Sequence, residues 1–161
     1  MKKIIDINGK EHEIDCIGCA IQSGKVVLPI ERITETENFS LEQDIEWPIE
    51  GFLVIASKRH IRSINEMSDA EMGEFAGLLR KARKALQEVL GISIVTLVQE
   101  ENTTSSHFHL WLFPWHSWMQ ERWQGEITEI KDIMQYSKKE MSGKENLDKI
   151  KQSVEKLRKE I

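Results

Sequence analysis

The chain has 161 residues, of which 40% are hydrophobic and 30% charged, and its formal net charge is -5 at pH 7. This length predicts one globular domain with a single core. Acidic and basic residues are interspersed, no apolar run reaches the ~20 residues of a membrane span, and the first residues lack the hydrophobic region of an export signal, so we expect neither a nucleic-acid polymer nor a membrane as partner.

The amino-terminal third is expected to form strands. Asn8-Gly9, which favours a type I′ turn, predicts a hairpin over residues 2–14, in which His12 is expected to be exposed. Residues 32–43 form a weakly patterned strand, and the run GFLVIA at 51–56 is a continuous apolar one. The only cysteines, Cys16 and Cys19, form a C-x-x-C pair, a spacing that suits metal or redox chemistry in a reduced compartment such as the cytoplasm.

The clearest helix begins after Ser68, which with Glu71 forms a capping box, and ends at Gly91. A β-branched strand at 92–98, a polar loop at 99–106 and a strand at 107–113 follow. The fold class predicted is α+β, with an antiparallel sheet of about five strands, one main packed helix, an N-terminal hairpin and a C-terminal helical extension.

The extension occupies residues 117–161 and belongs to the same domain as residues 1–116. Its apolar spacing predicts one helix from Met119 to about Lys139, a break at Ser142-Gly143 and a second helix that ends near Ile161. In that second helix the apolar residues are spaced 3, 4, 3, 4, a pattern typical of a helix packed on its own domain or on a second subunit.

The strand within SSHFHLWLFPWH carries the most unusual side chains. Alternation places Phe108, Leu110 and Leu112 on one face, suited to the main helix. The opposite face carries imidazoles and indoles, which are costly in a core unless each is hydrogen-bonded. The residues expected on that face are His107, His109, Trp111, Phe113 and Trp115.

Three interpretations of this pair of histidines remain open. Both can be hydrogen-bonded structural residues, both can bind one metal, or a neutral imidazole can attack phosphorus. Trp111 donates one hydrogen bond but neither accepts a proton nor binds a metal, which excludes a mechanism with three equivalent imidazoles.

Over about residues 14–116 the sequence resembles the histidine triad family of nucleotide hydrolases and transferases, whose signature is His-φ-His-φ-His-φ-φ, with φ apolar. The matching segments are His107-Phe108-His109-Leu110-Trp111-Leu112-Phe113-Pro114, Asp44-Ile45, Gly51-Phe-Leu-Val-Ile, Lys58-Arg59-His60 and Ser68-Asp-Ala-Glu71. Trp111 stands at the third histidine of the signature, and Gly18 and Glu42 stand where pocket aromatics are common.

The resemblance implies a role for each matching residue. His109 would attack an α-phosphorus while a backbone carbonyl holds its other ring nitrogen, and His107 and Trp111 would complete the catalytic strand. Asp44 would bind ribose hydroxyls. The remaining nucleotide-binding positions would be Ile17, Ile45, Asn102, Thr103 and Thr104.

Bacterial members with C-x-x-C bind zinc, and the resemblance implies a structural zinc site of Cys16, Cys19, His60 and His107. It also implies a homodimer.

We therefore predict a nucleotidyl hydrolase or transferase that cleaves a nucleoside phosphoanhydride, phosphoramidate or ester, such as a dinucleoside polyphosphate, through a nucleotidyl-histidine on His109. One alternative is a nucleotide-binding or regulatory protein whose catalysis Trp111 weakens or abolishes. Another makes the two histidines a catalytic metal site and C-x-x-C a separate redox pair.

Overall fold

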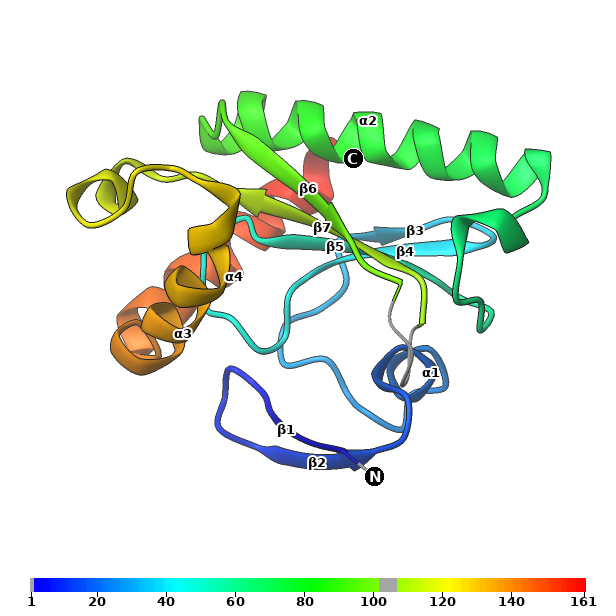
Figure 1. The fold of residues 1–161 in the computed structure, drawn as a ribbon, viewed down its shortest axis with the longest axis horizontal. Coiled ribbons are helices and arrows are strands. Elements are labelled where there is room, and N and C mark those ends of the chain that lie inside the picture. Colours follow the sequence, from blue (N-terminus) through cyan, green and yellow to red (C-terminus); the bar gives the residue numbers. More distant parts are fainter. Residues whose placement is uncertain (1, 102–106) are drawn as a thin grey trace.

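A five-stranded antiparallel sheet forms the centre of the molecule in the computed structural model, which describes residues 2–101 and 107–161 (Figure 1). The strand order is β3-β4-β5-β7-β6. The strands are β3 (Thr34–Glu35), β4 (Phe39–Gln43), β5 (Leu53–Ser57), β6 (Val95–Gln99) and β7 (His109–Pro114). The predicted strand at 32–43 is thus a hairpin of two strands. The chain turns between them at Thr36, whose hydroxyl accepts from the Phe39 N–H and donates to the Phe39 carbonyl.

The main helix, α2 (Asp69–Leu90), covers one face of this sheet (Figure 1). The Ser68 hydroxyl accepts from the Glu71 N–H and the Glu71 carboxylate accepts from the Ser68 N–H, which completes the predicted capping box. Gly91 ends the helix with a left-handed φ of 69°. A short 3-10 helix, η1 (Ile64–Glu66), precedes it. The predicted α+β fold is confirmed.

Strand β7 divides its side chains between the two faces of the sheet as alternation predicts. Leu110 and Leu112 are buried in the main core with residues of α2, as is Phe108 just before the strand. On the opposite face His109 lies beside Ala56, and Trp111 lies between Val54 and Val98 on the neighbouring strands. The second face therefore carries the polar and aromatic residues of β7.

The N-terminal hairpin consists of β1 (Lys2–Ile5) and β2 (Glu11–Ile14) and lies on the side of the sheet away from α2 (Figure 1). Its His12 is not exposed as predicted: the side chain is 8% exposed, and its Nε2 lies 2.9 Å from Asp6 Oδ2. The physical reason is that His12 shares a strand face with Ile14, which packs inward. Asp6 in the turn gives the buried ring a polar partner.

Helix α1 (Ile17–Gln22) was not predicted from the sequence. At six residues it is too short to be stable by itself, so it depends on tertiary contacts. The Cys16 Sγ caps it by accepting from the Cys19 N–H, and the Gln22 amide donates to Ser40 Oγ on β4 at 2.8 Å. The bond from Gln22 to Ser40 holds α1 over the sheet face opposite α2.

The prediction of one helix from Met119 to Lys139 is wrong in its first half. The chain instead forms two 3-10 turns, η2 (Ser117–Glu121) and η3 (Ile127–Glu129), before α3 (Ile130–Glu140). Gly125 breaks the pattern with a φ of 88°, and the Glu129 carboxylate accepts from the N–H groups of residues 124–126 to start a new helix. The apolar residues of this segment are nevertheless buried together, because Met119, Ile130 and Met134 belong to one core cluster.

The last helix, α4 (Lys144–Glu160), packs on its own domain. Ile150, Val154 and Leu157 are buried in the main core, and α4 contacts α2. Of the two alternatives for this apolar seam, the structure therefore has the intramolecular one. Among the described residues no helix combines the length and the apolarity that a membrane span requires.

Candidate functional site

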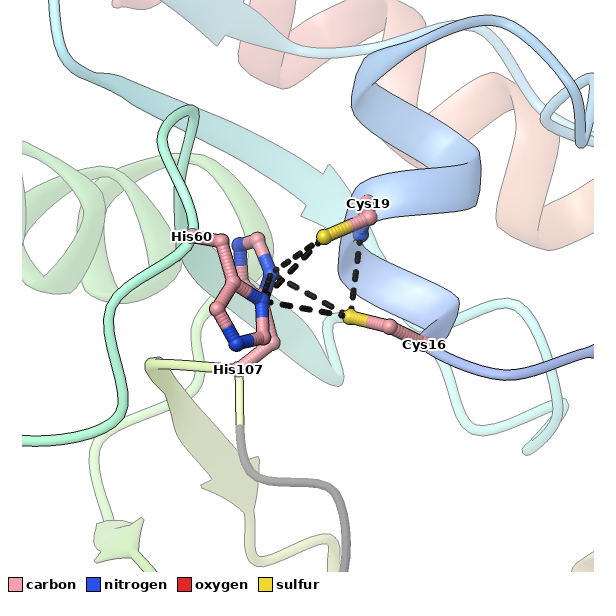
Figure 2. A group of neighbouring side chains, drawn as sticks. All are labelled: Cys16, Cys19, His60 and His107. Atoms are coloured by element: carbon pink, nitrogen blue, oxygen red, sulfur yellow. Dashed lines mark hydrogen bonds between the residues drawn. The ribbon is translucent and has the colours of Figure 1, made fainter.

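Four side chains from three separate segments meet at one edge of the second sheet face. Cys16 and Cys19 come from the start of α1, His60 from the loop after β5, and His107 from the residues just before β7 (Figure 2). One potential ligand atom from each lies within 4.8 Å of all the others. The cluster runs from the buried His107 to the exposed His60. The structure thus brings together all four residues of the expected metal site.

The distances within this cluster fit tetrahedral coordination. Zn–S bonds of about 2.3 Å and Zn–N bonds of about 2.0–2.1 Å at tetrahedral angles place S and N about 3.6 Å apart and two N atoms about 3.3 Å apart. The four S–N separations are 3.6, 3.4, 3.2 and 3.5 Å. The two Nδ1 atoms, of His60 and His107, are 3.3 Å apart. The donor set is therefore one that a tetrahedral metal ion can occupy.

His107 is fixed on both sides of its ring. Its Nε2 donates to the Ser57 carbonyl at 2.7 Å, so Nδ1 keeps the lone pair that points at the two sulfurs. Burial is the main cause that lowers the pKa of His107, and it keeps the ring neutral, as a metal ligand must be.

Cys19 would need a positive charge nearby to lose its proton at neutral pH. Burial, together with the neighbouring Cys16, raises the pKa of Cys19 from 9.0 to about 11, so the protein alone holds Cys19 as a thiol. A bound divalent cation reverses this preference because a coordinated thiol loses its proton.

Gly18 lets α1 approach this ring. A Cβ built on Gly18 would lie 2.4 Å from His107 Cγ, closer than real Cβ atoms approach other atoms. The second residue inside C-x-x-C is therefore glycine because the imidazole occupies the space of a side chain. The sequence showed Gly18 only as a departure from an aromatic pocket residue, and nothing in it pointed to this contact.

His109 has one ring nitrogen committed and one available. Its Nδ1 lies 2.9 Å from the His107 carbonyl oxygen, which can only accept, so Nδ1 carries the proton. Nε2 keeps its lone pair, and the half-buried ring lines a pocket. An imidazole held in this tautomer can act as a nucleophile or a base through Nε2.

The pocket beside His109 is lined by residues of α1 and of the second sheet face. Small side chains, Val54 and Ala56, form its floor next to β7. The residues that line it include six of those expected in the active site, namely Ile17, Asp44, Ile45, His107, His109 and Trp111. Asn102, Thr103 and Thr104 lie outside the described residues.

Asp44 is buried at the wall of this pocket. Its Oδ1 accepts from the N–H groups of Glu46 and Trp47 at 2.8 and 3.2 Å, which leaves Oδ2 for a ligand. Burial raises the pKa of Asp44 to about 7 in spite of these two bonds. The carboxyl is thus poised between its two protonation states near neutral pH, and it can accept a hydrogen bond from a hydroxyl in either one.

Glu42 is a charged pocket residue whose partner the sequence did not reveal. Its side chain is buried, and Arg32 Nε donates to it at 2.9 Å. Burial raises the pKa of Glu42, whereas Arg32 lowers it. Arg32 lies ten residues earlier on the segment before β3, a separation at which no local sequence rule pairs two residues.

Trp111 stands where the signature has its third histidine. The indole packs edge-on against His109, with ring centroids 5.4 Å apart, and against Phe52 at 5.7 Å. Its N–H bonds to none of the residues that the structure describes, and the side chain lines the pocket.

Solved structures similar to this chain include histidine triad proteins. A Hit-like protein involved in cell-cycle regulation from Bartonella henselae has a TM-score of 0.60 at 16% identity, covering 93% of this chain and 99% of its own. A zinc-bound histidine triad family protein from Mycobacterium smegmatis has 0.56 at 22%, covering 89% and 96%. A hypothetical histidine triad nucleotide-binding protein from Sulfolobus tokodaii has 0.62 at 16%, covering 89% and 92%.

Neither protein-family sequence models nor curated proteins give a match. The structural likeness shows that the chain has the histidine triad fold, and the resemblance expected from the sequence is confirmed for the fold.

The close approach of Gly18 to His107 predicts the effect of adding a methyl group. Gly18→Ala should lower the free energy of unfolding by about 1–3 kcal/mol, because the ring or α1 must move. Gly73→Ala is the matched control: it lies in α2 with open space around it, and helix propensity predicts a gain of about 0.5–1 kcal/mol. Denaturant titration measures both, and equal stabilisation by the two substitutions would contradict the contact.

The raised pKa of Asp44 predicts a specific pH dependence of stability. The folded state binds the Asp44 proton more tightly than the unfolded chain, whose carboxyl has its ordinary pKa of 3.8. Stability from this group is therefore full at low pH, falls as pH rises from about 4 to about 7, and is constant above that.

Asp44→Asn keeps the acceptor oxygen but cannot titrate. Between about pH 5 and pH 8 the wild-type protein should lose roughly 2–3 kcal/mol relative to this variant. Urea titrations at the two pH values measure the difference, and parallel pH profiles would show that Asp44 has no raised pKa.

Proposed function

We propose that the protein is a nucleotidyl hydrolase or transferase of the histidine triad type, with His109 as nucleophile. The observation that carries the proposal is the bond from His109 Nδ1 to the His107 carbonyl, which leaves Nε2 unprotonated beside a pocket. Asp44 in the same pocket offers a free carboxyl oxygen for ribose hydroxyls, and Ile17 and Ile45 offer apolar surface for a base.

The reaction proceeds in two steps. In the first, the lone pair of His109 Nε2 forms a bond to the α-phosphorus, and the bond from phosphorus to the leaving group breaks with its electron pair on the leaving group. In the second, water attacks the phosphorus and the N–P bond breaks. This step yields the nucleoside monophosphate, returns the neutral ring and releases the proton of the water to solvent.

The substrates of this proposal are nucleoside phosphoanhydrides, phosphoramidates or esters, of which a dinucleoside polyphosphate is one example. Trp111 can donate a hydrogen bond to the leaving group but cannot hand over its proton at neutral pH. Leaving groups that are stable as anions are therefore favoured.

Zinc is the metal that we propose for the Cys16, Cys19, His60 and His107 cluster. Two thiolates and two imidazoles form a closed tetrahedral site with no position for substrate, so zinc here holds α1 and His107 in place. Both thiols must stay reduced to bind it, which fits a reducing compartment such as the cytoplasm.

A homodimer is the proposed assembly. Strand β6 is an edge of the sheet, and Ile94 and Leu97 beside that edge are 58% and 48% exposed. Exposed apolar residues on an unpaired edge favour pairing with a second copy. Sedimentation velocity tests this assembly, which a monomer at micromolar concentration would contradict.

A nucleotide-binding or regulatory protein is the second candidate, and Trp111 is the observation that favours it. Calorimetry with AMP and GMP beside a hydrolysis assay separates the two functions, because binding without turnover supports the second.

Replacement of the nucleophile gives the sharpest test of the enzyme. His109→Ala should reduce turnover of diadenosine tetraphosphate by about 10³-fold or more and abolish the labelled nucleotidyl adduct. His12→Ala is the control, because that ring is paired with Asp6 in the hairpin and lies outside the pocket. An unchanged adduct on His109→Ala would exclude His109 as nucleophile.

Metal content distinguishes a structural from a catalytic zinc site. Cys16→Ser should reduce bound zinc from about one ion per chain to near zero and lower the unfolding temperature, because structural zinc contributes directly to folding. His109→Ala should retain zinc. The opposite pattern, zinc kept by Cys16→Ser and lost by His109→Ala, would support a metal site on the two histidines and a separate redox pair.

A further inference from the structure

A second pocket lies on the same sheet face as the pocket beside His109, on the other side of Trp111. Trp111 lines both pockets. Its cross-strand neighbour Val98 on β6 extends the floor of the second one. The two pockets are therefore adjacent, and a single indole forms the boundary between them.

The walls of this second pocket come from segments outside the catalytic strand. Trp47 from the loop after β4 lines it, and α3 and η3 contribute Ile127, Ile130 and Met134. Ile127 is 63% exposed although it is apolar. The cavity of about 500 Å³ is within the range of about 300–1,000 Å³ typical of small-ligand pockets. We call this cavity the Trp47–Trp111 pocket.

The chemistry of the lining selects a flat and largely uncharged group. Two indoles offer surfaces for stacking, which is favourable for any aromatic ring. Glu100 and Lys131, both exposed, bring one charge of each sign, so the pocket has no excess positive charge for a polyphosphate. Lys131 has no ion-pair partner in the part of the chain that the structure describes, and it can contact a polar edge of the ligand.

We propose that the Trp47–Trp111 pocket binds the leaving group of the substrate and selects leaving groups with an aromatic ring system. This inference rests on the proposed function of His109. In an aryl ester, the bond from His109 Nε2 to phosphorus forms as the P–O bond to the aryl group breaks. The electron pair stays on the departing oxygen, the Trp111 N–H donates a hydrogen bond to this aryloxide, and water then protonates it.

The absence of a proton donor at position 111 supports an aromatic leaving group. An aryloxide spreads its negative charge over the ring, so it departs without protonation, whereas an alkoxide or amide anion does not. The C-terminal extension then determines specificity, because α3 and η3 supply most of the apolar wall.

Two esters of AMP test the proposal, the phenyl and the 2-naphthyl ester. They break the same bond and release oxygens of similar acidity, but the naphthyl group has one more fused ring to stack. Wild-type kcat/KM should be about tenfold higher for the naphthyl ester. Trp47→Leu and Ile127→Ser should each bring this ratio close to one, because kcat/KM for the naphthyl ester falls more than kcat/KM for the phenyl ester.

Trp123→Leu is the matched control. It removes an indole from the same aromatic cluster, but Trp123 lines a different cavity. Ile127→Ser keeps the test valid if Trp47→Leu does not fold, because Ile127 is exposed. A ratio that is unchanged in both pocket variants, or that falls equally in Trp123→Leu, overturns the pocket while the His109 adduct still supports the enzyme. If neither ester gives turnover or an adduct on His109, the proposed function fails and the pocket proposal fails with it.

Discussion

The placement of His107 is the constraint on which the rest of the site depends. Its Nε2 bonds to the Ser57 carbonyl, its Nδ1 faces the two cysteines, and its own carbonyl holds the Nδ1 of His109. One residue thus connects the cysteine and histidine cluster, the sheet and the proposed nucleophile. The His107 ring therefore orients the cluster, and the His107 backbone carbonyl sets the tautomer of His109.

One face of the sheet forms the main core, and the other carries the pocket. On one face, aliphatic residues of β5 and β7 pack against α2 and form the main core with α4. On the other, Val54 and Ala56 are small enough to leave a pocket beside His109, while Phe52 and Phe113 join Trp111 in an aromatic cluster with α3. The change from small to aromatic side chains along this face gives the site two compartments with Trp111 between them.

Local patterns predicted the parts of the fold that local physics determines. Alternation gave the two faces of β7, and Ser68 with Glu71 gave the start of α2. The sequence could not show that α1 exists, because a helix this short is stabilised by tertiary bonds such as that from Gln22 to Ser40. Burial of His12 depends in the same way on Asp6, and the contact of Gly18 with His107 joins residues far apart in sequence. The contact of Cys16 with His60 and His107 was predicted only from the family resemblance, since no spacing rule brings segments so distant together.

Attack by His109 on phosphorus requires a proton on Nδ1 and a free lone pair on Nε2. Two-bond ¹⁵N–¹H correlation NMR of the histidine rings reads this tautomer directly, and comparison with His109→Ala assigns the signal. We expect the signals of the Nδ1–H tautomer, with an unprotonated Nε2 on the neutral His109 ring. A neutral ring with its proton on Nε2 would contradict it, because that nitrogen could then not attack phosphorus.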